Sequence, residues 1–258
     1  MKVVILAGGR GTRIAEESKL TPKPMIRIGE EPILWHIMKE YSHYGFNEFI
    51  ICAGYKQQVI KEWFNNYMLY NSDITFDFSE DEKKIIVHKK NYEPWKVTIV
   101  DTGLDTLTGG RIKRVKEYLN NETFMMTYGD GVSDIDIKKL LEFHKSHGKL
   151  ATLTSFVIEQ QKGVLKVDRH GTIKEFREKN IMDGSLINAG YMVLEPQVLD
   201  YIAGDETVFE KEPLEKLVSD GQLAAYKHSG FWKCMDTMKD KEELESLWNN
   251  GQAKWKVW

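Results

Sequence analysis

A short apolar run that ends in glycines is the feature that most limits how this chain can fold. Residues 3–7 read Val-Val-Ile-Leu-Ala and continue directly into Gly8 and Gly9. An unbroken apolar run bounded by turn residues is typical of a strand covered on both faces, as in a parallel sheet. Because parallel strands need long crossovers, usually helical, the run predicts an α/β fold with helices between successive strands.

The following residues have the expected helical patterns. Apolar side chains recur at helix spacing over residues 32–44, where Pro32 suits the first turn and Gly45 suits the end. A second strand is expected at 48–53 and a second amphipathic helix at 57–70. This order predicts a right-handed crossover. The pattern resumes with a helix, a buried strand and a helix at residues 111–118, 123–128 and 136–147.

Strands prevail elsewhere. Short strands at 74–78, 84–88 and 97–100 predict an excursion at the sheet edge, with a functional loop at 102–110. After residue 150 the predicted strands are 151–158, 164–168, 172–177, 189–194 and 223–227, with helices at 212–219 and 238–248. We expect one domain, residues 1–258, with a Rossmann-like, mixed and mostly parallel sheet flanked by helices. Its halves are about 1–150 and a β-rich 151–258 that ends in a helix.

Composition restricts the partners and the compartment. The chain has 36 Lys and Arg against 39 Asp and Glu, so a net charge of -3 provides no global basic field for nucleic acid. No apolar stretch is long enough to span a bilayer, and the N-terminal run is too short for a signal peptide. Cys52 and Cys234 have no metal or redox spacing. The sequence predicts a cytosolic protein without a membrane or nucleic-acid partner.

The glycines after the first strand predict an anion site. A glycine-rich turn at the carboxyl end of a parallel strand brings backbone N–H groups close to phosphates. The loop lacks the Gly-Lys-Ser/Thr of a Walker A motif, and Ile14 replaces the third glycine of the dinucleotide fingerprint. Arg13 adds a planar fork of donors, and Lys23 lies between Pro22 and Pro24, which stiffen the backbone around its ammonium group. The alternative is a tight turn with solvated cations.

Gly-Gly-Arg-Gly-Thr-Arg at residues 8–13, followed by Pro-Lys-Pro-Met at 22–25, resembles the sugar-1-phosphate nucleotidyltransferase family. Further stretches are similar to its glucose-1-phosphate cytidylyltransferase branch, namely residues 32–38, 93–95, 100–103, 108–111, 127–131, 230–232 and 235–237. The similarity extends in order along essentially the whole chain. It implies transfer of CMP from CTP to glucose 1-phosphate with release of pyrophosphate, and a homo-oligomer, either a trimer or a hexamer.

The resemblance also implies roles for individual residues. Asp130 and Asp236 would be the protein ligands of Mg²⁺, a hard cation that keeps waters and bridges phosphates. Lys23, Arg13 and Asp130 would be catalytic. The first half would bind nucleotide through Leu6, Ala7, Gly8, Gly9, Gly11, Thr12, Arg13, Thr106, Arg111 and Gly129. The second half would bind the sugar phosphate through Glu178, Lys179 and Asn188, together with Lys23.

The sequence departs from the branch near the predicted sugar site. Asn180 stands in place of proline after Glu178-Lys179, Gln160–Gly163 lacks an expected arginine and aromatic residue, and Ala189 replaces a glycine. The acceptor therefore stays open between glucose 1-phosphate and another phosphorylated sugar or polyol. UTP or dTTP stays open as the nucleotide, because backbone geometry decides base selection.

Other kinds of site are less favoured by the sequence. A non-catalytic sensor would be expected to lose Lys23 or one of the two aspartates, but all three are present. His144 and His147 have no third ligand at metal spacing, and the lysine-rich helix around them suggests a solvated face. Trp248, Trp255 and Trp258 lack an accompanying basic stripe, so packing or a subunit contact is preferred to base stacking.

Overall fold

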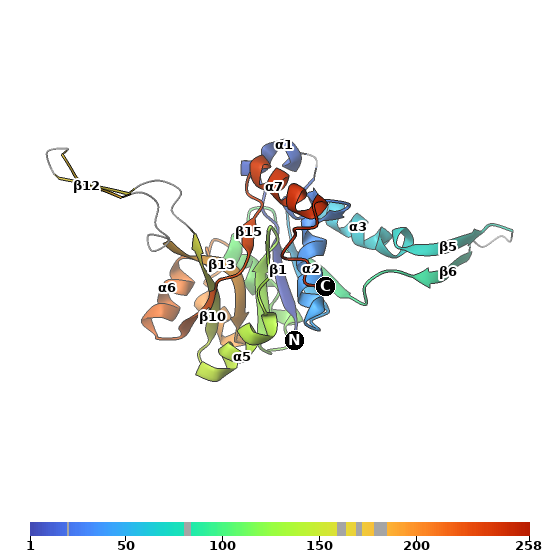
Figure 1. Ribbon diagram of the computed structural model, residues 1–258. Helices are drawn as coiled ribbons and strands as arrows, with labels where there is room; N and C mark the ends of the chain where they lie inside the picture. The colour runs from blue at the N-terminus through green and yellow to red at the C-terminus, as the bar shows by residue number, and fades with distance from the viewer. Residues whose placement is uncertain (20, 80–83, 159–163, 169–171, 178–184) are drawn as a thin grey trace.

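The computed structural model describes residues 1–19, 21–79, 84–158, 164–168, 172–177 and 185–258. Within them, seven strands form a mixed sheet in the order β14-β10-β13-β8-β1-β4-β7 (Figure 1). Six of these strands run in one direction, and β13 is antiparallel to both of its neighbours. In chain order the strands are β1 (Val3–Ala7), β4 (Glu48–Ala53), β7 (Lys96–Asp101), β8 (Phe124–Tyr128), β10 (Ala151–Ile158), β13 (Ser185–Leu194) and β14 (Leu223–His228). The predicted mostly parallel sheet is confirmed.

Helices cover both faces of the sheet and explain the unbroken apolar sequence of β1. Val3 and Ile5 pack on one face, and Val4 and Leu6 on the other. The first core contains side chains from α2 (Ile33–His43), α3 (Gln57–Tyr70), α5 (Ile137–His147) and α7 (Met238–Asn249). The second contains side chains from α4 (Thr108–Arg114) and α6 (Glu212–Ser219), and from the 3-10 turn at Pro196–Tyr201.

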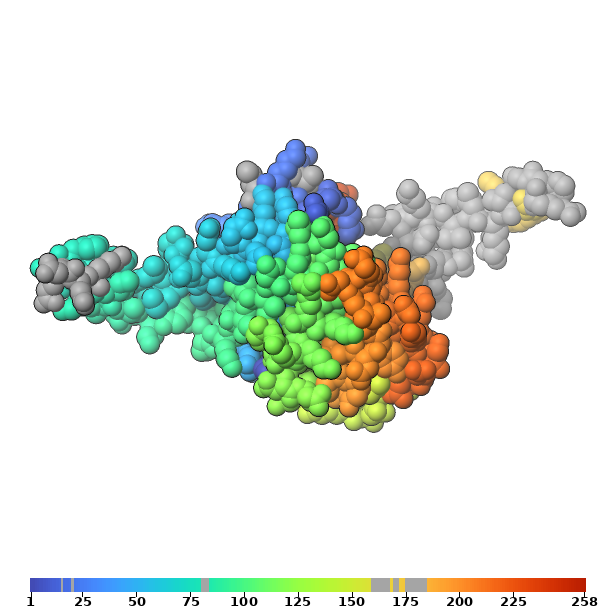
Figure 2. Space-filling view, turned by 180° about the vertical axis from the view of Figure 1, so that it is seen from behind, coloured from blue at the N-terminus to red at the C-terminus, as the bar shows by residue number. Residues whose placement is uncertain are grey.

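Smaller elements project from the sheet or complete it. Strands β5 (Ser72–Asp77) and β6 (Lys84–Lys90) pair as an arm that extends from the body of the molecule (Figures 1 and 2). Strands β11 (Val164–Val167) and β12 (Ile173–Arg177), both close to the predicted strands, form another antiparallel pair. The ladder of β9 (Gly131–Ser133) with β15 (Trp232–Cys234) joins distant parts of the chain. The remaining elements are β2 (Arg27–Ile28), β3 (Glu31–Pro32), α1 (Ala15–Ser18), and 3-10 turns at Thr12–Ile14, Lys23–Met25 and Lys116–Tyr118.

Several sequence predictions were wrong at element boundaries or in placement. The helix predicted at 111–118 begins at Thr108 and ends at Arg114. Its first turn packs closely on Asp205, because Gly110 has no side chain and an added Cβ would lie 2.5 Å from the Asp205 Cα. The predicted loop at 102–110 therefore ends in the first turn of this helix. The strand predicted at 97–100 is not part of the protruding arm; it is β7, which pairs in parallel with β4.

The prediction of a solvated face for His144 was also wrong. His144 is buried, and its ring bonds the Thr152 hydroxyl at 2.8 Å and Glu195 Oε1 at 3.1 Å. It therefore fastens α5 to the sheet. No group of three or more metal-ligand side chains occurs in the described part of the chain. Among the described residues, no helix is long and apolar enough to cross a membrane.

The aromatic C-terminal segment packs on α2, as preferred from the sequence. Trp255 is fully buried, and Trp248 contacts the ring of His36 edge-on at a centroid distance of 4.6 Å. The His36 Nε2–H donates to the Ile28 carbonyl at 2.9 Å, so its Nδ1 accepts from the indole N–H of Trp255. Burial lowers the pKa of His36 to about 4. The neutral tautomer therefore joins the C-terminal segment to the core.

We expect the protein to lose stability as the pH falls from 6.5 towards 4. In this window the unfolded chain binds a proton on His36 and the folded chain does not, so folding becomes less favourable by up to about 3 kcal/mol. Urea unfolding at pH 7 and pH 5 measures the change, and His36→Phe should reduce the difference. His43→Phe, at an exposed position of the same helix, is the control. An unchanged pH dependence in His36→Phe would contradict the assignment.

Candidate active site

The site lies at the carboxyl ends of the central parallel strands. Strands β1, β4 and β8 end at Ala7, Ala53 and Tyr128, which lie at the same edge of the sheet because the strands pair in parallel. A cavity of about 390 Å³ opens there. All the predicted nucleotide residues line it: Leu6, Ala7, Gly8, Gly9, Gly11, Thr12, Arg13, Thr106, Arg111 and Gly129. Lys23, Asp130 and Asp236 line it as well.

A second, smaller cavity adjoins the first. Its volume is about 270 Å³, and Arg13, Tyr128, Asp130 and Asp236 line both cavities. The predicted sugar residue Asn188 lines only the smaller one. Glu178 and Lys179 lie outside the described residues, as do Gln160–Gly163 and Asn180. The structure therefore brings together every described residue of the predicted site, and two carboxylates mark the place where the cavities meet.

The ammonium group of Lys23 lies between the two carboxylates. Its Nζ donates to Asp130 Oδ2 at 2.5 Å and to Asp236 Oδ1 at 2.6 Å. Lys23 lies between Pro22 and Pro24 and is the first residue of the 3-10 turn Lys23–Met25. Only 8% of the lysine is exposed. This local structure agrees with the predicted stiffening by the two prolines. The charged group is thus held before any ligand enters.

The carboxylates overcome the effect of burial on Lys23. Burial favours the neutral amine, but the coulombic attraction of Asp130 and hydrogen bonds to both aspartates raise the pKa of Lys23. Burial likewise opposes the charge on Asp236, but the hydrogen bond and charge of Lys23, the hydrogen bond from Cys234 and the charge of Arg13 together outweigh it and lower the pKa of Asp236. Arg13, whose side chain is largely exposed, donates to Asp236 Oδ2 at 2.7 Å. Two cations therefore balance the two carboxylates in the free protein.

The ladder of β9 and β15 brings the two aspartates together. Asp130 directly precedes β9, and Asp236 follows β15 by two residues. Cys234 pairs with Gly131, and the backbone N–H of Met235 donates to the Asp130 carbonyl at 2.8 Å. Residues more than a hundred positions apart in sequence therefore reach the same point through main-chain pairing.

The Arg111 side chain is buried and hydrogen-bonded within the protein, which its predicted contact with nucleotide did not imply. It is 5% exposed, and it donates to the Thr102 hydroxyl at 2.8 Å and to the Gly103 carbonyl at 2.7 Å. Its guanidinium also packs against Gly8, where an added Cβ would lie 2.1 Å from Nη1. Burial lowers its pKa. Arg111 thus fixes the loop wall around the larger cavity, and contact with nucleotide stays a prediction.

Gly129 is required by packing within the protein. A Cβ at this position would lie 2.8 Å from the Leu6 carbonyl oxygen and 3.0 Å from the ring of Pro24. Its N–H donates to the same Leu6 carbonyl at 3.0 Å. The residue therefore lets β8 approach β1 and the Lys23 turn closely, and space for a ribose stays a prediction.

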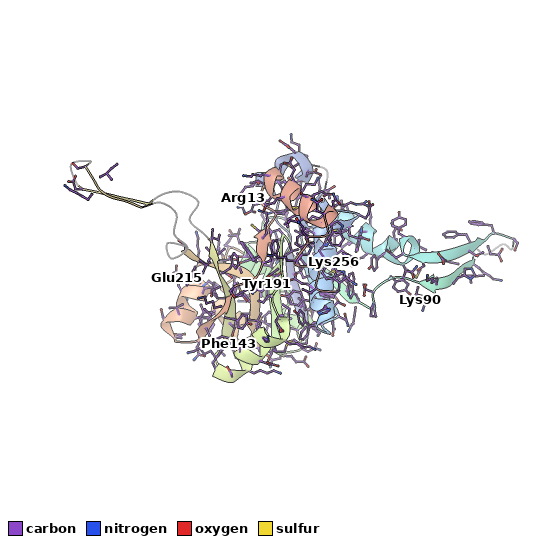
Figure 3. The ribbon with its side chains drawn as sticks, viewed as in Figure 1. Arg13, Lys90, Phe143, Tyr191, Glu215 and Lys256 are labelled. Atoms are coloured by element: carbon purple, nitrogen blue, oxygen red, sulfur yellow. The ribbon has the colours of Figure 1, made fainter. Side chains whose placement is uncertain are left out.

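Sequence reasoning missed several wall residues. Tyr128 and Trp232 were part of the stretches that carried the resemblance, but neither was assigned to the site. The indole of Trp232 donates to the Ala189 carbonyl at 2.7 Å on the wall of the smaller cavity. The other unassigned wall residues are Ile14, Pro24, Leu107, Thr108, Thr127, Gly131, Ala189, Tyr191 and Cys234. Figure 3 shows Arg13 beside α7 and Tyr191 within the sheet.

Comparison with known proteins identifies the family. Residues 2–249 match the model of the family described as nucleotidyl transferase. The chain belongs to the nucleotidyl transferase family. This nucleotidyl transferase is 54% identical to glucose-1-phosphate cytidylyltransferase of Salmonella typhimurium, and 47% identical to a probable glucose-1-phosphate cytidylyltransferase of Bacillus subtilis. Both alignments cover 100% of each chain, so the resemblance to this branch is confirmed.

Solved structures of other proteins share the fold. HddC from Yersinia pseudotuberculosis superimposes with a TM-score of 0.67 at 23% identity, covering 96% of this nucleotidyl transferase and 99% of HddC. A UDP-glucose pyrophosphorylase complexed with UDP-glucose gives a TM-score of 0.69 at 17% identity, covering 97% and 98%. At these identities the likeness shows the α/β fold alone.

Proposed function

We propose that this nucleotidyl transferase transfers CMP from CTP to α-D-glucose 1-phosphate, giving CDP-glucose and pyrophosphate. The observation that carries the proposal is Lys23, held between Asp130 and Asp236 where the two cavities meet. The full-length similarity to glucose-1-phosphate cytidylyltransferases supports CTP and glucose 1-phosphate as the substrates. We assign the nucleotide to the larger cavity and the sugar phosphate to the smaller one, and hence to the first and second halves of the chain.

The reaction is an in-line displacement. A phosphate oxygen of glucose 1-phosphate forms a bond to the α-phosphorus of CTP, while the bond from that phosphorus to the β-phosphate oxygen breaks and pyrophosphate leaves. A phosphate monoester is already largely dianionic at neutral pH, so no side chain has to remove a proton. Lys23 screens the α-phosphate and the sugar phosphate from each other, and Arg13 screens the departing phosphates.

The two carboxylates fit a magnesium ion. Oxygens of Asp130 and Asp236 converge on one ammonium group, and both side chains are about a quarter exposed and face the cavities. Mg²⁺ is commonly held by one or two carboxylates together with substrate phosphates and water. When bound there, it would supply positive charge to the α-phosphate. The residues that hold it would be Asp130 and Asp236, so the arriving ion would compete with Lys23 for their oxygens.

Pyrophosphate release tests the proposal. The purified protein is incubated with glucose 1-phosphate and CTP, UTP, dTTP, ATP or GTP, with Mg²⁺ or with EDTA. We expect release with CTP and Mg²⁺, and little release with the other nucleotides or with EDTA. Release with UTP or dTTP instead of CTP would assign that nucleotide as the substrate. No release with any nucleotide would refute the reaction with glucose 1-phosphate.

Gly9 allows the phosphate loop to be tested without disturbing the fold. A Cβ at Gly9 has no neighbour within 4 Å, whereas a Cβ at Gly8 would collide with Arg111. We expect Gly9→Ala to weaken CTP binding about tenfold, because the methyl group holds phosphates away from the backbone N–H groups, while stability changes by less than about 0.5 kcal/mol. Calorimetry and thermal melts measure the two effects. Gly8→Ala should instead lower stability, and unchanged CTP binding in Gly9→Ala would contradict the placement.

We also propose a cytoplasmic homo-oligomer, a trimer or hexamer. The two free cysteines suit a reducing compartment. The β5–β6 arm supports self-association, because one face of it carries Ile74, Phe76, Ile85 and Val87, and the ring of Phe78 stacks on that of Phe76. Phe78 is 71% exposed, and Phe76 and Ile85 are more than 40% exposed. A two-stranded ribbon is marginal alone in water, so an apolar face on it favours a protein contact.

Charge on the apolar face of the arm should weaken the oligomer. We expect Ile85→Asp to raise the subunit dissociation constant at least about tenfold, because burying the carboxylate is unfavourable. Analytical ultracentrifugation should then show mass moving towards the 30.0 kDa of one chain. Thr75→Asp, on the opposite face, is the matched control. A wild-type monomer, or equal dissociation of both variants, would contradict this contact.

A further inference from the structure

Tyr128 forms a wall that both cavities share. It ends β8 two residues before Asp130, and it is the aromatic residue that lines both spaces. Its ring lies against Gly190, where an added Cβ would be 2.4 Å from Cδ2. Gly190 has a φ of +85° and lies where the β10–β13 register shifts. This bulge leaves room for the ring and fixes its position between the cavities.

Glu210 holds this wall and the edge of the larger cavity at the same time. The Tyr128 hydroxyl donates to Glu210 Oε1 at 2.5 Å, and the Thr108 hydroxyl donates to Glu210 Oε2 at 2.6 Å. Thr108 lines the larger cavity and is the first residue of α4. A carboxylate is an acceptor with two oxygens, so both hydroxyl protons can point to it. One half-buried side chain therefore joins the wall that both cavities share to a residue at the edge of the larger cavity.

The direction of the surrounding hydrogen bonds agrees with this arrangement. The backbone N–H of Phe209 donates to the Thr108 oxygen at 2.9 Å, which leaves the Thr108 proton for Glu210. On the other side the Asn188 Oδ1 accepts from the Gly190 N–H at 2.9 Å, beside the glycine against which the Tyr128 ring packs. Two hydroxyl donors therefore reach Glu210, one from the wall that both cavities share and one from the larger cavity.

We propose that Glu210 is a positioning residue that links the two substrate cavities, so that nucleotide and sugar phosphate each bind more tightly when the other is present. This proposal rests on the proposed function. A ligand that fixes Thr108 also fixes the Glu210 carboxylate, and through it Tyr128, which lines both cavities. The second ligand then meets a wall that is already ordered, and the reciprocal effect must be equal in size. Glu210 lines neither cavity, so it acts through its two partners.

Glu210→Gln tests the linkage, because the variant keeps the shape of the side chain and loses one of its two acceptor oxygens. The Thr108 and Tyr128 hydroxyls both donate, and an amide offers one oxygen for two donors. Tyr128→Phe removes one connection while it keeps the ring on Gly190. Glu206→Gln is the matched control, since Glu206 is an exposed glutamate of the same segment.

Calorimetry measures the linkage without turnover. The probes are glucose 1-phosphate and a CTP analogue with a methylene group in place of the α,β-bridging oxygen, both with Mg²⁺. In the wild type and in Glu206→Gln, saturation with glucose 1-phosphate should tighten analogue binding about tenfold. In Glu210→Gln and Tyr128→Phe the tightening should fall to about twofold or less, while the affinity for the analogue alone changes less.

The outcomes separate this inference from the proposed function. If the wild type binds neither probe, the assignment of CTP and glucose 1-phosphate as substrates is refuted. A wild type that binds both probes independently would leave the substrates in place and overturn the linkage. Retained tightening in Glu210→Gln would overturn the role of Glu210. If that variant does not fold, which thermal melts report, the result with Tyr128→Phe decides.

Discussion

Lys23→Met should almost abolish pyrophosphate release while the protein still folds. The ammonium group is the buried cation between the two carboxylates, and it is positioned before substrate arrives. Removing a preorganised charge at the transferring phosphate typically costs 10²–10³ in kcat, and we expect about a 10³-fold loss. Methionine keeps much of the length of the side chain, so the 3-10 turn should persist. Steady-state kinetics with saturating CTP and glucose 1-phosphate measure the effect.

The same variant should respond to magnesium more strongly than the wild type. Without Lys23, Asp130 and Asp236 repel each other, so the melting temperature in EDTA should fall. A divalent cation can then take the place of the ammonium group, and Mg²⁺ should raise the melting temperature further in Lys23→Met than in the wild type. Lys19→Met, at an exposed position nearby, controls for charge. A variant with more than a tenth of wild-type kcat would contradict the role of Lys23.

Asp236→Asn should lower pyrophosphate release about 10²–10³-fold and raise the Mg²⁺ concentration needed for half-maximal rate. The amide oxygen can still accept from Lys23 or Arg13, so the fold should be retained. Only the charge that would hold the ion disappears. Magnesium titrations of the initial rate give both quantities. Asp220→Asn, at an exposed position that accepts from the Tyr201 hydroxyl, is the control.

Asp236→Asn should also change how the melting temperature depends on pH in acid. Because Lys23 holds the pKa of Asp236 below its usual 3.8, the ionised form stabilises the folded protein above that pH. This contribution is lost as the pH falls through the lower folded value. Asp236→Asn should therefore flatten the acid decline of the melting temperature. Full activity in the variant, or an unaltered acid decline, would contradict the assignment of the carboxylate.

Local chemistry was the part of the site that sequence could predict. Pro22 and Pro24 restrict Lys23 through their own rings, and the glycines follow β1 directly, so neighbouring residues contain most of the information. The approach of Asp236 to Asp130 depends instead on the pairing of β9 with β15. That ladder is set by strand register far along the chain, so only the family resemblance indicated the pair.

Burial and long-range packing explain one wrong prediction, the solvated face for His144, and one environment that the sequence did not indicate, that of Arg111. His144 has lysine neighbours in sequence, yet its position on α5 faces Thr152 and Glu195 across the core boundary. Arg111 has the residue type of a phosphate ligand, but its guanidinium donates to the Thr102 hydroxyl and to the carbonyls of Gly103 and Leu104. In both cases the hydrogen-bond partners of a polar side chain cannot be predicted from the spacing of residues in the sequence.

The late position of Asp236 has a consequence for how the protein acquires its activity during synthesis. The last strand of the main sheet, β14, ends at His228, so every strand of that sheet leaves the ribosome before Asp236 does. Domains tend to fold from the N-terminus during synthesis, and Lys23 can then meet Asp130 while the second carboxylate is still absent. Strand β15, which pairs with β9, and the tryptophans that pack on α2 are synthesised afterwards. Their packing positions Asp236 beside Asp130. We therefore expect a nascent chain with a complete sheet to release no pyrophosphate until Asp236 is in place.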